Sequence, residues 1–422
     1  MTTNDDAGTN VNIDIDRLLQ RIKELGRVGA LEGGGVCRLA LTDADRQGRD
    51  LVLRWMKELE LRISIDRIGN VIGVRAGLED GPPVTIGSHI DTVATGGLYD
   101  GNLGVLAGLE VITTLNDAGI ETHRPVAVGF FTNEEGARFA PDMMGSGVHQ
   151  GALDIDEMLA VRGIDGTTVL EELSQIGYAG TIPVGKFRAH CYFELHVEQG
   201  PVLEEAGIEI GAVTGVQGIS WTEYRITGVS NHAGTTPMRL RHDAGYVAAA
   251  IAVEARRLAS EFGGNQVATV GVNELRPNLV NVIANQALVT VDLRNTDDAL
   301  LNQAEARMAG FVRQTARAED VNVQTRTLAR FAPVEFNAAM IALVEENAKT
   351  LGHSVRRLPS GAGHDAQMFA PNCPTAMIFV PSRDGISHNI NEYTEPAHIQ
   401  AGANTLLQAV MTQANSGNST NA

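Results

Sequence analysis

The sequence predicts a two-domain α/β protein in which a smaller α+β domain interrupts a domain with a mostly parallel sheet. Three observations predict this fold. A chain of 422 residues is long enough for about two or three domains. Strand-like and helix-like segments alternate in both the first and the last part of the chain, and a different order separates them. A content of 43% hydrophobic and 20% charged residues is typical of a folded globular protein.

The first part, residues 1–214, is expected to begin with two helices. Apolar residues at helical spacing follow Asp14, which suits an N-cap, and a second helix is expected from about Thr42. Further elements are expected as strands at 70–75, 84–88, 126–132 and 192–197, and as a helix at 104–115. Strands that alternate with helices predict a largely parallel sheet.

The middle part, residues 215–329, has a different order of elements. We expect a strand at 220–228, a helix at 243–261, strands at 267–274 and 287–294, a helix at 298–318 and a strand at 321–327. This β-α-β-β-α-β order is typical of an open sandwich. The α/β order then resumes with a strand at 376–380. We therefore predict a catalytic domain formed by 1–214 and 330–422, with 215–329 inserted into it.

Charge and cysteine content limit which binding partners and which cellular compartment are expected. With 33 Lys and Arg against 51 Asp and Glu, the net charge is −18, so we expect neither nucleic acid nor a membrane as a partner. Cys37, Cys191 and Cys373 are too far apart to suggest a disulfide framework or a zinc ribbon. The N-terminus is acidic, unlike a secretory signal, and no apolar run could span a bilayer. These features predict a cytoplasmic protein.

Residues of the metal-binding type follow the predicted strand at 84–88. His89 and Asp91 form a His-x-Asp pair in which the imidazole could bind a metal and the carboxylate could orient it. Asp100 lies in a Tyr-Asp-Gly turn, where its carboxylate could bridge two cations. Taken singly, each has an ordinary alternative, a surface histidine beside an aspartate or an N-capping turn.

Similar residues follow the other apolar strands. Glu134 and Glu135 are neighbours whose side chains should point in different directions, so one could bind a metal while the other faces a metal-bound water. A solvated helix start is the alternative. His196 and His388 also accompany apolar strands, although a single histidine is more often structural. Together, three histidines, one aspartate and one glutamate at strand ends suit Zn²⁺, Mn²⁺ or Co²⁺.

Longer motifs around these residues resemble the dinuclear zinc aminoacylase and dipeptidase superfamily. They are 87–93 (Gly-Ser-His-Ile-Asp-Thr-Val), 99–101 (Tyr-Asp-Gly), 133–136 (Asn-Glu-Glu-Gly), 194–201 (Glu-Leu-His-Val-Glu-Gln-Gly-Pro) and 387–389 (Ser-His-Asn). Segments 231–238 (Asn-His-Ala-Gly-Thr-Thr-Pro-Met) and 360–366 (Ser-Gly-Ala-Gly-His-Asp-Ala) resemble its hydantoinase/carbamoylase-type amidase branch. That branch contains N-carbamoyl-L-amino-acid hydrolases, β-ureidopropionases and allantoate amidohydrolases. The resemblance extends from about residue 15 to residue 412.

The resemblance implies a phosphorylase/hydrolase-like catalytic domain that holds two divalent metal ions, which are Zn²⁺ or, alternatively, Mn²⁺ or Co²⁺. It also implies that the inserted domain is a lid through which the chain forms a homodimer. The implied roles are one metal on His89 and His196, the other on Glu135 and His388, a bridging Asp100, Glu134 as the general base, and Asp91 as the residue that orients His89.

The resemblance also implies substrate-binding residues. His232 would donate a hydrogen bond to the oxyanion in the partner subunit's site, while Asn281 and Arg294 would hold the substrate. An arginine suits a carboxylate because its planar fork can bind both oxygens. From the residues alone, His232 could equally be a turn histidine and Arg294 an ordinary strand-end arginine. Pocket-lining roles are implied for Gln199, Gly361 and His364.

The predicted activity is cleavage of the ureido C–N bond of an N-carbamoyl-L-amino acid or N-carbamoyl-β-alanine, giving the amino acid, CO₂ and ammonia. The expected partner is therefore a small ureido or amide molecule with a carboxylate. Allantoate hydrolysis is the alternative within the branch, because allantoate offers the same two groups. An aminoacylase or dipeptidase is the second alternative. A non-catalytic binding protein is disfavoured by Glu134, because a binding module needs no general base.

Overall fold

The computed structural model describes residues 11–185 and 187–416, which divide into two units. Unit 1 contains the described residues up to Thr214 and from Glu335 onward, and unit 2 is Gly215–Val334. The boundary expected at residue 330 falls inside strand β10 (Asn322–Phe331), so unit 2 ends slightly later. The acidic N-terminal residues that favoured a cytoplasmic compartment lie outside the described residues.

The described residues of unit 1 form a nine-stranded sheet with the order β1-β2-β4-β3-β5-β13-β6-β11, and β12 pairs with β6. The strands are β1 (Arg62–Ile65), β2 (Val71–Arg75), β3 (Val84–His89), β4 (Val126–Phe131), β5 (Cys191–Val197), β6 (Ile210–Val216), β11 (Val334–Glu335), β12 (Val355–Ser360) and β13 (Thr375–Val380). The central strands β4, β3, β5 and β13 are parallel neighbours. β2 and β6 flank them in antiparallel pairing. The predicted mixed α/β fold is confirmed.

The central strands place polar residues at one edge of the sheet. Every residue of β3, β4, β5 and β13 is buried, as expected for parallel strands covered on both faces. β4 has the sequence Val-Ala-Val-Gly-Phe-Phe, an apolar run without alternation. Parallel strands end at the same edge, so the segments that come directly after β3, β4, β5 and β13 meet there.

The helices of unit 1 are α1 (Ile15–Leu25), α2 (Asp43–Glu58), α3 (Asn102–Asp117), α4 (Met144–Gln150), α5 (Ile155–Ala160), α6 (Val169–Ile176), α7 (Val202–Ala206), α10 (Ala338–Thr350), α11 (Asp365–Phe369) and α12 (Pro396–Asn415). The predicted N-cap Asp14 is confirmed, since it accepts the N–H of Arg17. Thr42, from which the second helix was expected to start, caps α2 by accepting the N–H of Asp45. α3 is almost wholly buried, because it packs against β3, β4 and β5 as well as α1 and α12. None of the helices in the described part could cross a membrane.

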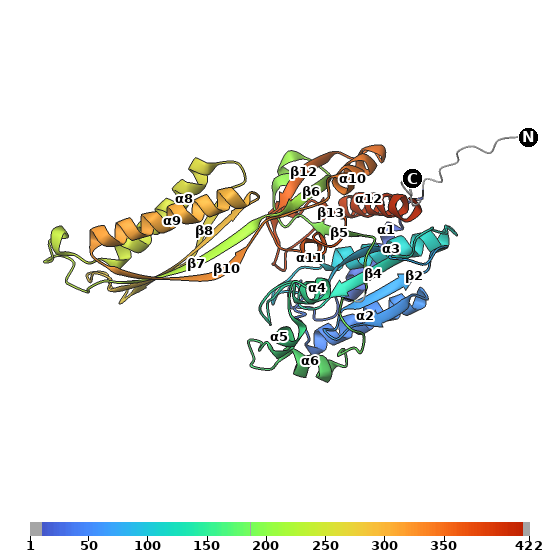
Figure 1. Ribbon diagram of the computed structural model, residues 1–422, viewed down its shortest axis with the longest axis horizontal. Coiled ribbons are helices and arrows are strands. Elements are labelled where there is room, and N and C mark those ends of the chain that lie inside the picture. Colours follow the sequence, from blue (N-terminus) through green and yellow to red (C-terminus); the bar gives the residue numbers. More distant parts are fainter. Residues whose placement is uncertain (1–10, 186, 417–422) are drawn as a thin grey trace, which may run out of the picture. The chain divides into compact units, whose positions relative to one another are not determined.

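The described residues of unit 2 form a four-stranded antiparallel sheet with the order β10-β7-β9-β8. Its other elements are β7 (Gly218–Thr227), β8 (Val267–Arg276), β9 (Gln286–Asn295), α8 (Ala244–Phe262) and α9 (Asp298–Glu319). Both helices pack on the same face of the sheet (Figure 1). Val289 and Val291 of β9 are buried beneath them, whereas Asp292 and Arg294 alternate onto the uncovered face. Unit 2 is therefore a one-sided sheet of the open-sandwich type.

Candidate metal centre

Two groups of ligand-type side chains share Asp100. His89, Asp100 and His196 form one group and Asp100, Glu135 and His388 form the other, with the ligand atoms of each group within 4.8 Å of one another. Asp100 Oδ1 lies 3.5 Å from His89 Nε2 and 3.2 Å from His196 Nε2. Its other oxygen, Oδ2, lies 3.4 Å from His388 Nε2. Asp100 thus directs one carboxylate oxygen to each group.

Hydrogen bonds set the tautomers of the two buried histidines. His89 ends β3 and His196 lies near the end of β5. His89 Nδ1 is 2.9 Å from the carbonyl oxygen of Asp91, and His196 Nδ1 is 2.8 Å from that of Val197. A carbonyl can only accept, so Nδ1 carries a proton in both rings and each Nε2 is on the side of Asp100. This is the arrangement that a metal-binding imidazole needs.

Asp91 makes more contacts than it would need if it only oriented His89, its predicted role. Its backbone carbonyl, not its carboxylate, orients His89, because the carboxylate lies 4.0 Å from the imidazole. The carboxylate instead accepts the backbone N–H groups of Glu134 at 3.3 Å and Glu135 at 3.4 Å. Burial raises the pKa of Asp91 to about 6. Asp91 therefore fixes the segment after β4 beside the end of β3.

The two neighbouring glutamates face different partners. Glu134 Oε2 lies 3.3 Å from His89 Nε2, and Glu135 Oε2 lies 3.3 Å from His388 Nε2. Burial, with a further contribution from Asp365, raises the pKa of Glu134 well above its usual value despite the opposing effect of His89. A carboxylate with a raised pKa can both accept and return a proton near neutral pH.

Backbone strain is concentrated around these side chains. Four residues other than glycine have a positive φ here, namely Asn133, Met143, Gln199 and His388. Such a backbone is unfavourable for these residues and must be held by its surroundings. The amide of Asn133, for example, donates to the carbonyl oxygens of Phe139 and Pro141. This turn directs Glu134 and Glu135 away from the end of β4.

The predicted pocket residues of unit 1 lie beside the ligands. Gln199 Nε2 donates to Asp100 Oδ2 at 2.8 Å. The His364 ring is 4.5 Å from that of His196, and its Nε2 is 2.8 Å from Ser360 Oγ. Burial, and secondly His196, lowers the pKa of His364 well below its usual value, so this imidazole is neutral. Gly361 directly follows Ser360 at the end of β12.

Glu194 is a further buried carboxylate, for which the sequence suggested no role. It forms a third group of ligand-type atoms with His196 and His364. Its oxygens are already engaged, because Ser88 Oγ donates to one at 2.6 Å and the N–H of Ala366 to the other at 2.8 Å. Glu194 is therefore an anchor between β5, β3 and α11. A charged residue inside a strand of mostly apolar residues was the available sequence signal.

His232 and Asn281 lie on paired, exposed loops of unit 2. The N–H of Ala233 donates to the carbonyl oxygen of Asn281 at 2.9 Å. His232 Nδ1 accepts the N–H groups of Gly234 at 3.0 Å and Thr235 at 3.2 Å. An acceptor Nδ1 places the proton of the neutral ring on Nε2. His232 therefore has one remaining donor, as an oxyanion ligand requires.

Arg294 lies on the uncovered face of the unit 2 sheet. Its Nε donates to Asp292 Oδ1 at 3.1 Å, and its Nη2 donates to Asp292 Oδ2 at 2.9 Å. The two residues are two positions apart on β9 and so share one face. Asp292 thus holds the guanidinium group in a fixed direction.

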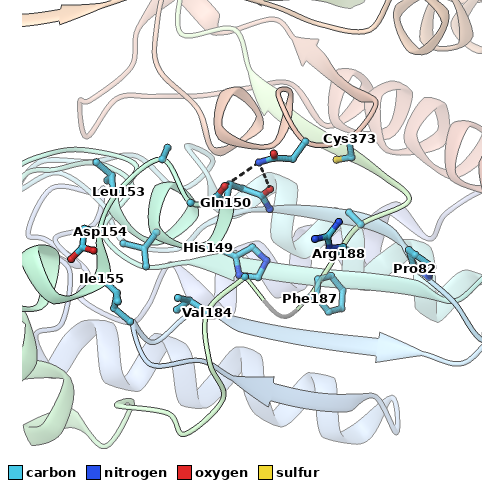
Figure 2. A pocket seen from close by; sticks show the side chains of 16 residues that line it. Pro82, His149, Gln150, Leu153, Asp154, Ile155, Val184, Phe187, Arg188 and Cys373 are labelled. Carbon is cyan, nitrogen blue, oxygen red and sulfur yellow. Dashed lines mark hydrogen bonds between the residues drawn. The ribbon is translucent and has the colours of Figure 1, made fainter.

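A cavity of about 700 Å³ in unit 1 contains none of the predicted site residues (Figure 2). His149, Gln150 and Arg188 are among its lining residues, and Asn372 Nδ2 donates to the backbone oxygen of Gln150 at 3.1 Å and to its Oε1 at 2.9 Å. Cavity size alone does not identify a reaction centre. The donor atoms around Asp100 are the stronger evidence, because they have the chemistry for metal binding.

The donor set around Asp100 fits two divalent cations. It consists of imidazole nitrogens and carboxylate oxygens without a thiolate, which suits Zn²⁺, Mn²⁺ or Co²⁺. Hydrogen bonds to Asp100 and Glu135 raise the pKa of His388 to about 10. Burial would lower the pKa of His89, but Glu134 and Asp100 raise it well above the usual value. The centre thus has an excess of negative charge that favours bound cations.

Known proteins share this chain's sequence and fold. Residues 85–412 match the profile of peptidase family M20/M25/M40. The chain is 40% identical to an N-carbamoyl-L-amino-acid amidohydrolase of Rhizobium meliloti, over 96% of this chain and 97% of the relative. It is 34% identical to the allantoate amidohydrolase of Escherichia coli K12, over 90% and 94%. A hydantoinase/carbamoylase family amidase from Burkholderia multivorans matches with a TM-score of 0.94 and 45% identity, over 96% and 99%.

Proposed function

The chain belongs to peptidase family M20/M25/M40, and from this premise we propose that it is a metal-dependent amidohydrolase that cleaves the ureido C–N bond of N-carbamoyl amino acids. The substrates would be N-carbamoyl-L-amino acids or N-carbamoyl-β-alanine, and the products the amino acid, CO₂ and ammonia. One observation carries the proposal, namely Asp100 between two ligand groups with Glu134 beside them. The substrate class is supported by the name of the Rhizobium relative.

Two cations are part of the proposal. His89, His196 and Asp100 would hold one, while Glu135, His388 and Asp100 would hold the other. When bound, the cations polarise the substrate carbonyl and make water easier to deprotonate. We propose Zn²⁺, with Mn²⁺ and Co²⁺ as ions that suit the same donors.

Glu134 would transfer the proton. As the attacking water forms its bond to the ureido carbon, Glu134 accepts the water proton, and it then donates that proton to the nitrogen that leaves. The buried position of Glu134 supports this role, because burial raises the pKa of its carboxyl well above the usual value and so makes it a stronger proton acceptor. Asp91 would keep Glu134 in place through the backbone N–H that it accepts.

Unit 2 would recognise the substrate. Arg294 and Asn281 would bind its carboxylate, and His232 Nε2–H would donate to the developing oxyanion. We propose that His232 acts in the site of the partner subunit of a homodimer. The exposed apolar residues near the two loops, Met238, Leu279 and Val280, support an association surface there.

The proposal also includes a second candidate substrate and a cellular compartment. Allantoate is the second candidate substrate, because the E. coli relative bears the name allantoate amidohydrolase and allantoate has the same ureido and carboxylate groups. The compartment would be the cytoplasm, because Cys37, Cys191 and Cys373 are all free.

The testing experiment compares four substrates at equal concentration with added Mn²⁺ or Co²⁺. Ammonia release is measured for N-carbamoyl-alanine, N-carbamoyl-β-alanine and allantoate, and free alanine for N-acetyl-alanine. We expect the highest kcat/KM for one of the two N-carbamoyl amino acids. A clear preference for allantoate would replace the leading substrate with the second candidate, and hydrolysis of N-acetyl-alanine alone would contradict both. The Glu134→Gln protein serves as the control for contaminating activity.

A further inference from the structure

Glu392 lies next to Asp100 but has no part in the roles assigned above. It belongs to the segment between β13 and α12, the same segment that carries His388. Its side chain is buried, with 5% of the residue exposed. Glu392 forms no ion pair with any residue that the structure describes. A buried carboxylate without a cationic partner is unfavourable, so its contacts need an explanation.

Glu392 contacts Asp100 by two routes, of which the second passes through a serine hydroxyl whose single proton goes to one carboxylate oxygen at a time. Glu392 Oε1 accepts the backbone N–H groups of Tyr99 at 3.1 Å and Asp100 at 3.0 Å. Glu392 Oε2 lies 2.8 Å from Ser387 Oγ, which is itself 3.0 Å from Asp100 Oδ2. One side chain thus contacts the backbone of Asp100 directly and its carboxylate through the Ser387 hydroxyl.

The surrounding loop is shaped to admit this side chain. A Cβ atom at Gly97 would overlap the Glu392 carboxylate, so only glycine leaves the space that Glu392 fills. Ser387 directly precedes His388, whose Nε2 lies 3.4 Å from Asp100 Oδ2. Glu392 therefore links the segment that carries Asp100 to the segment that carries His388.

We propose that Glu392 is a positioning residue. It directs the Asp100 carboxylate at both metal positions and holds His388 beside that carboxylate. This inference rests on the proposed dinuclear centre. Glu392 acts here through hydrogen bonds and not through its charge. A glutamine could replace it, because its amide oxygen can accept both backbone N–H groups and its NH₂ can donate to Ser387 Oγ. An alanine would leave those two N–H groups without a partner.

The experiment measures metal affinity and stoichiometry in Glu392→Ala and Glu392→Gln. Each protein is stripped with a chelator and titrated with Zn²⁺ against a chromophoric competitor. We expect wild type and Glu392→Gln to bind two ions with similar affinity, and Glu392→Ala to bind at least one of them about 10- to 100-fold more weakly. Glu395→Ala is the matched control, because Glu395 is exposed, lies three residues away and pairs with Arg383.

Wild-type affinity in Glu392→Ala would overturn the inference, as would an equal loss in Glu392→Gln and Glu392→Ala. If wild type itself binds fewer than two ions, the dinuclear centre fails instead, and the two failures are thereby distinguished. Melting of the stripped proteins shows whether Glu392→Ala folds. If it does not fold, the Ser387→Ala protein is tested in its place. Loss of the hydroxyl between Asp100 and Glu392 should also weaken Zn²⁺ binding. Unchanged Zn²⁺ binding in Ser387→Ala would overturn the inference.

Discussion

The two units hold their predicted functional residues in opposite ways. In unit 1 the side chains around Asp100 are mostly buried and are fixed by hydrogen bonds from several distant segments. In unit 2, His232 is exposed and is held by Gly234 and Thr235, its neighbours in sequence. Arg294 is likewise held by Asp292 on its own strand. Unit 1 thus presents two groups of side chains that could hold metal ions, whereas the proposed substrate-binding residues of unit 2 are held only by neighbours on their own loop or strand.

The architecture of the two sheets explains this difference. A parallel sheet covered on both faces collects the ends of several strands at one edge and buries the residues that lie directly after them. An antiparallel sheet with one covered face leaves the other face and its loops exposed. Changes in unit 1 should therefore remove metal or chemistry, while changes in unit 2 should alter substrate handling and leave the metal content intact.

The largest effect is expected for Glu134→Gln in unit 1. Loss of the proposed general base should lower turnover roughly 10²- to 10⁴-fold while both metal ions remain bound, because Glu134 belongs to neither ligand group around Asp100. Glu135→Ala should lose metal as well as activity. Turnover is measured by ammonia release and metal by elemental analysis. Near-normal turnover in Glu134→Gln would mean that another group takes the proton.

The next largest effect is expected for His232→Ala in unit 2. Loss of an oxyanion donor should lower turnover about 10²-fold without any loss of metal. His242→Ala is the control, because His242 is a half-buried histidine of the same unit whose Nδ1 contacts the carbonyl oxygen of Asp320.

Mixed dimers test whether His232 acts across subunits. A His232→Ala subunit keeps its own Glu134, and a Glu134→Ala subunit can supply the missing His232. Random co-expression in equal amounts should restore about a quarter of wild-type activity, since half of the dimers are mixed and one of their two sites is whole. No recovery in a preparation shown to contain mixed dimers would place His232 in its own subunit's site or outside catalysis.

A smaller effect is expected for Arg294→Lys. Replacing the planar fork with a point charge should lower kcat/KM about tenfold, equivalent to about 1.4 kcal/mol of hydrogen bonding. Arg225→Lys is the matched control, because Arg225 pairs with Glu223 on β7 at the same two-residue spacing. A substrate analogue with a neutral amide in place of the carboxylate should not distinguish Arg294→Lys from wild type. Equal losses with both substrates would give Arg294 a structural role only.

Sequence alone predicted the helices with strong periodicity and the strands that are continuous apolar runs. α1 begins directly after its predicted cap, Asp14, and α2 begins directly after Thr42, where the second helix was expected to start. The apolar strands β3, β4 and β5 lie within a residue or so of the expected ranges. β1, with four residues, and β11, with two, were missed because such short strands have no periodicity to detect. The antiparallel pairing of β2 and β6 at the sides of the sheet depends on contacts between distant segments, which single-strand patterns do not contain.

The same distinction, between signals within one segment and contacts between distant segments, applies to the candidate metal centre. His89, His196 and Glu134 were identifiable because polar residues at the end of an apolar strand need a reason. The contacts of the Asp91 carboxylate with two backbone N–H groups, and the link from Glu392 to Asp100, depend on how loops fold against one another. Asp100 and Glu392 are separated by 292 positions in the chain, so no local pattern connects them.

The central claim, that unit 1 alone supplies a dinuclear centre and unit 2 none of its ligands, is tested most directly by counting bound metal. Wild type, Glu134→Gln, His232→Ala and Asp100→Ala are saturated with Zn²⁺, dialysed and analysed for metal per chain. We expect two ions in the first three proteins and loss of both in Asp100→Ala, because its carboxylate faces both ligand groups. Full activity in metal-free wild type, or two ions retained in Asp100→Ala, would contradict the account.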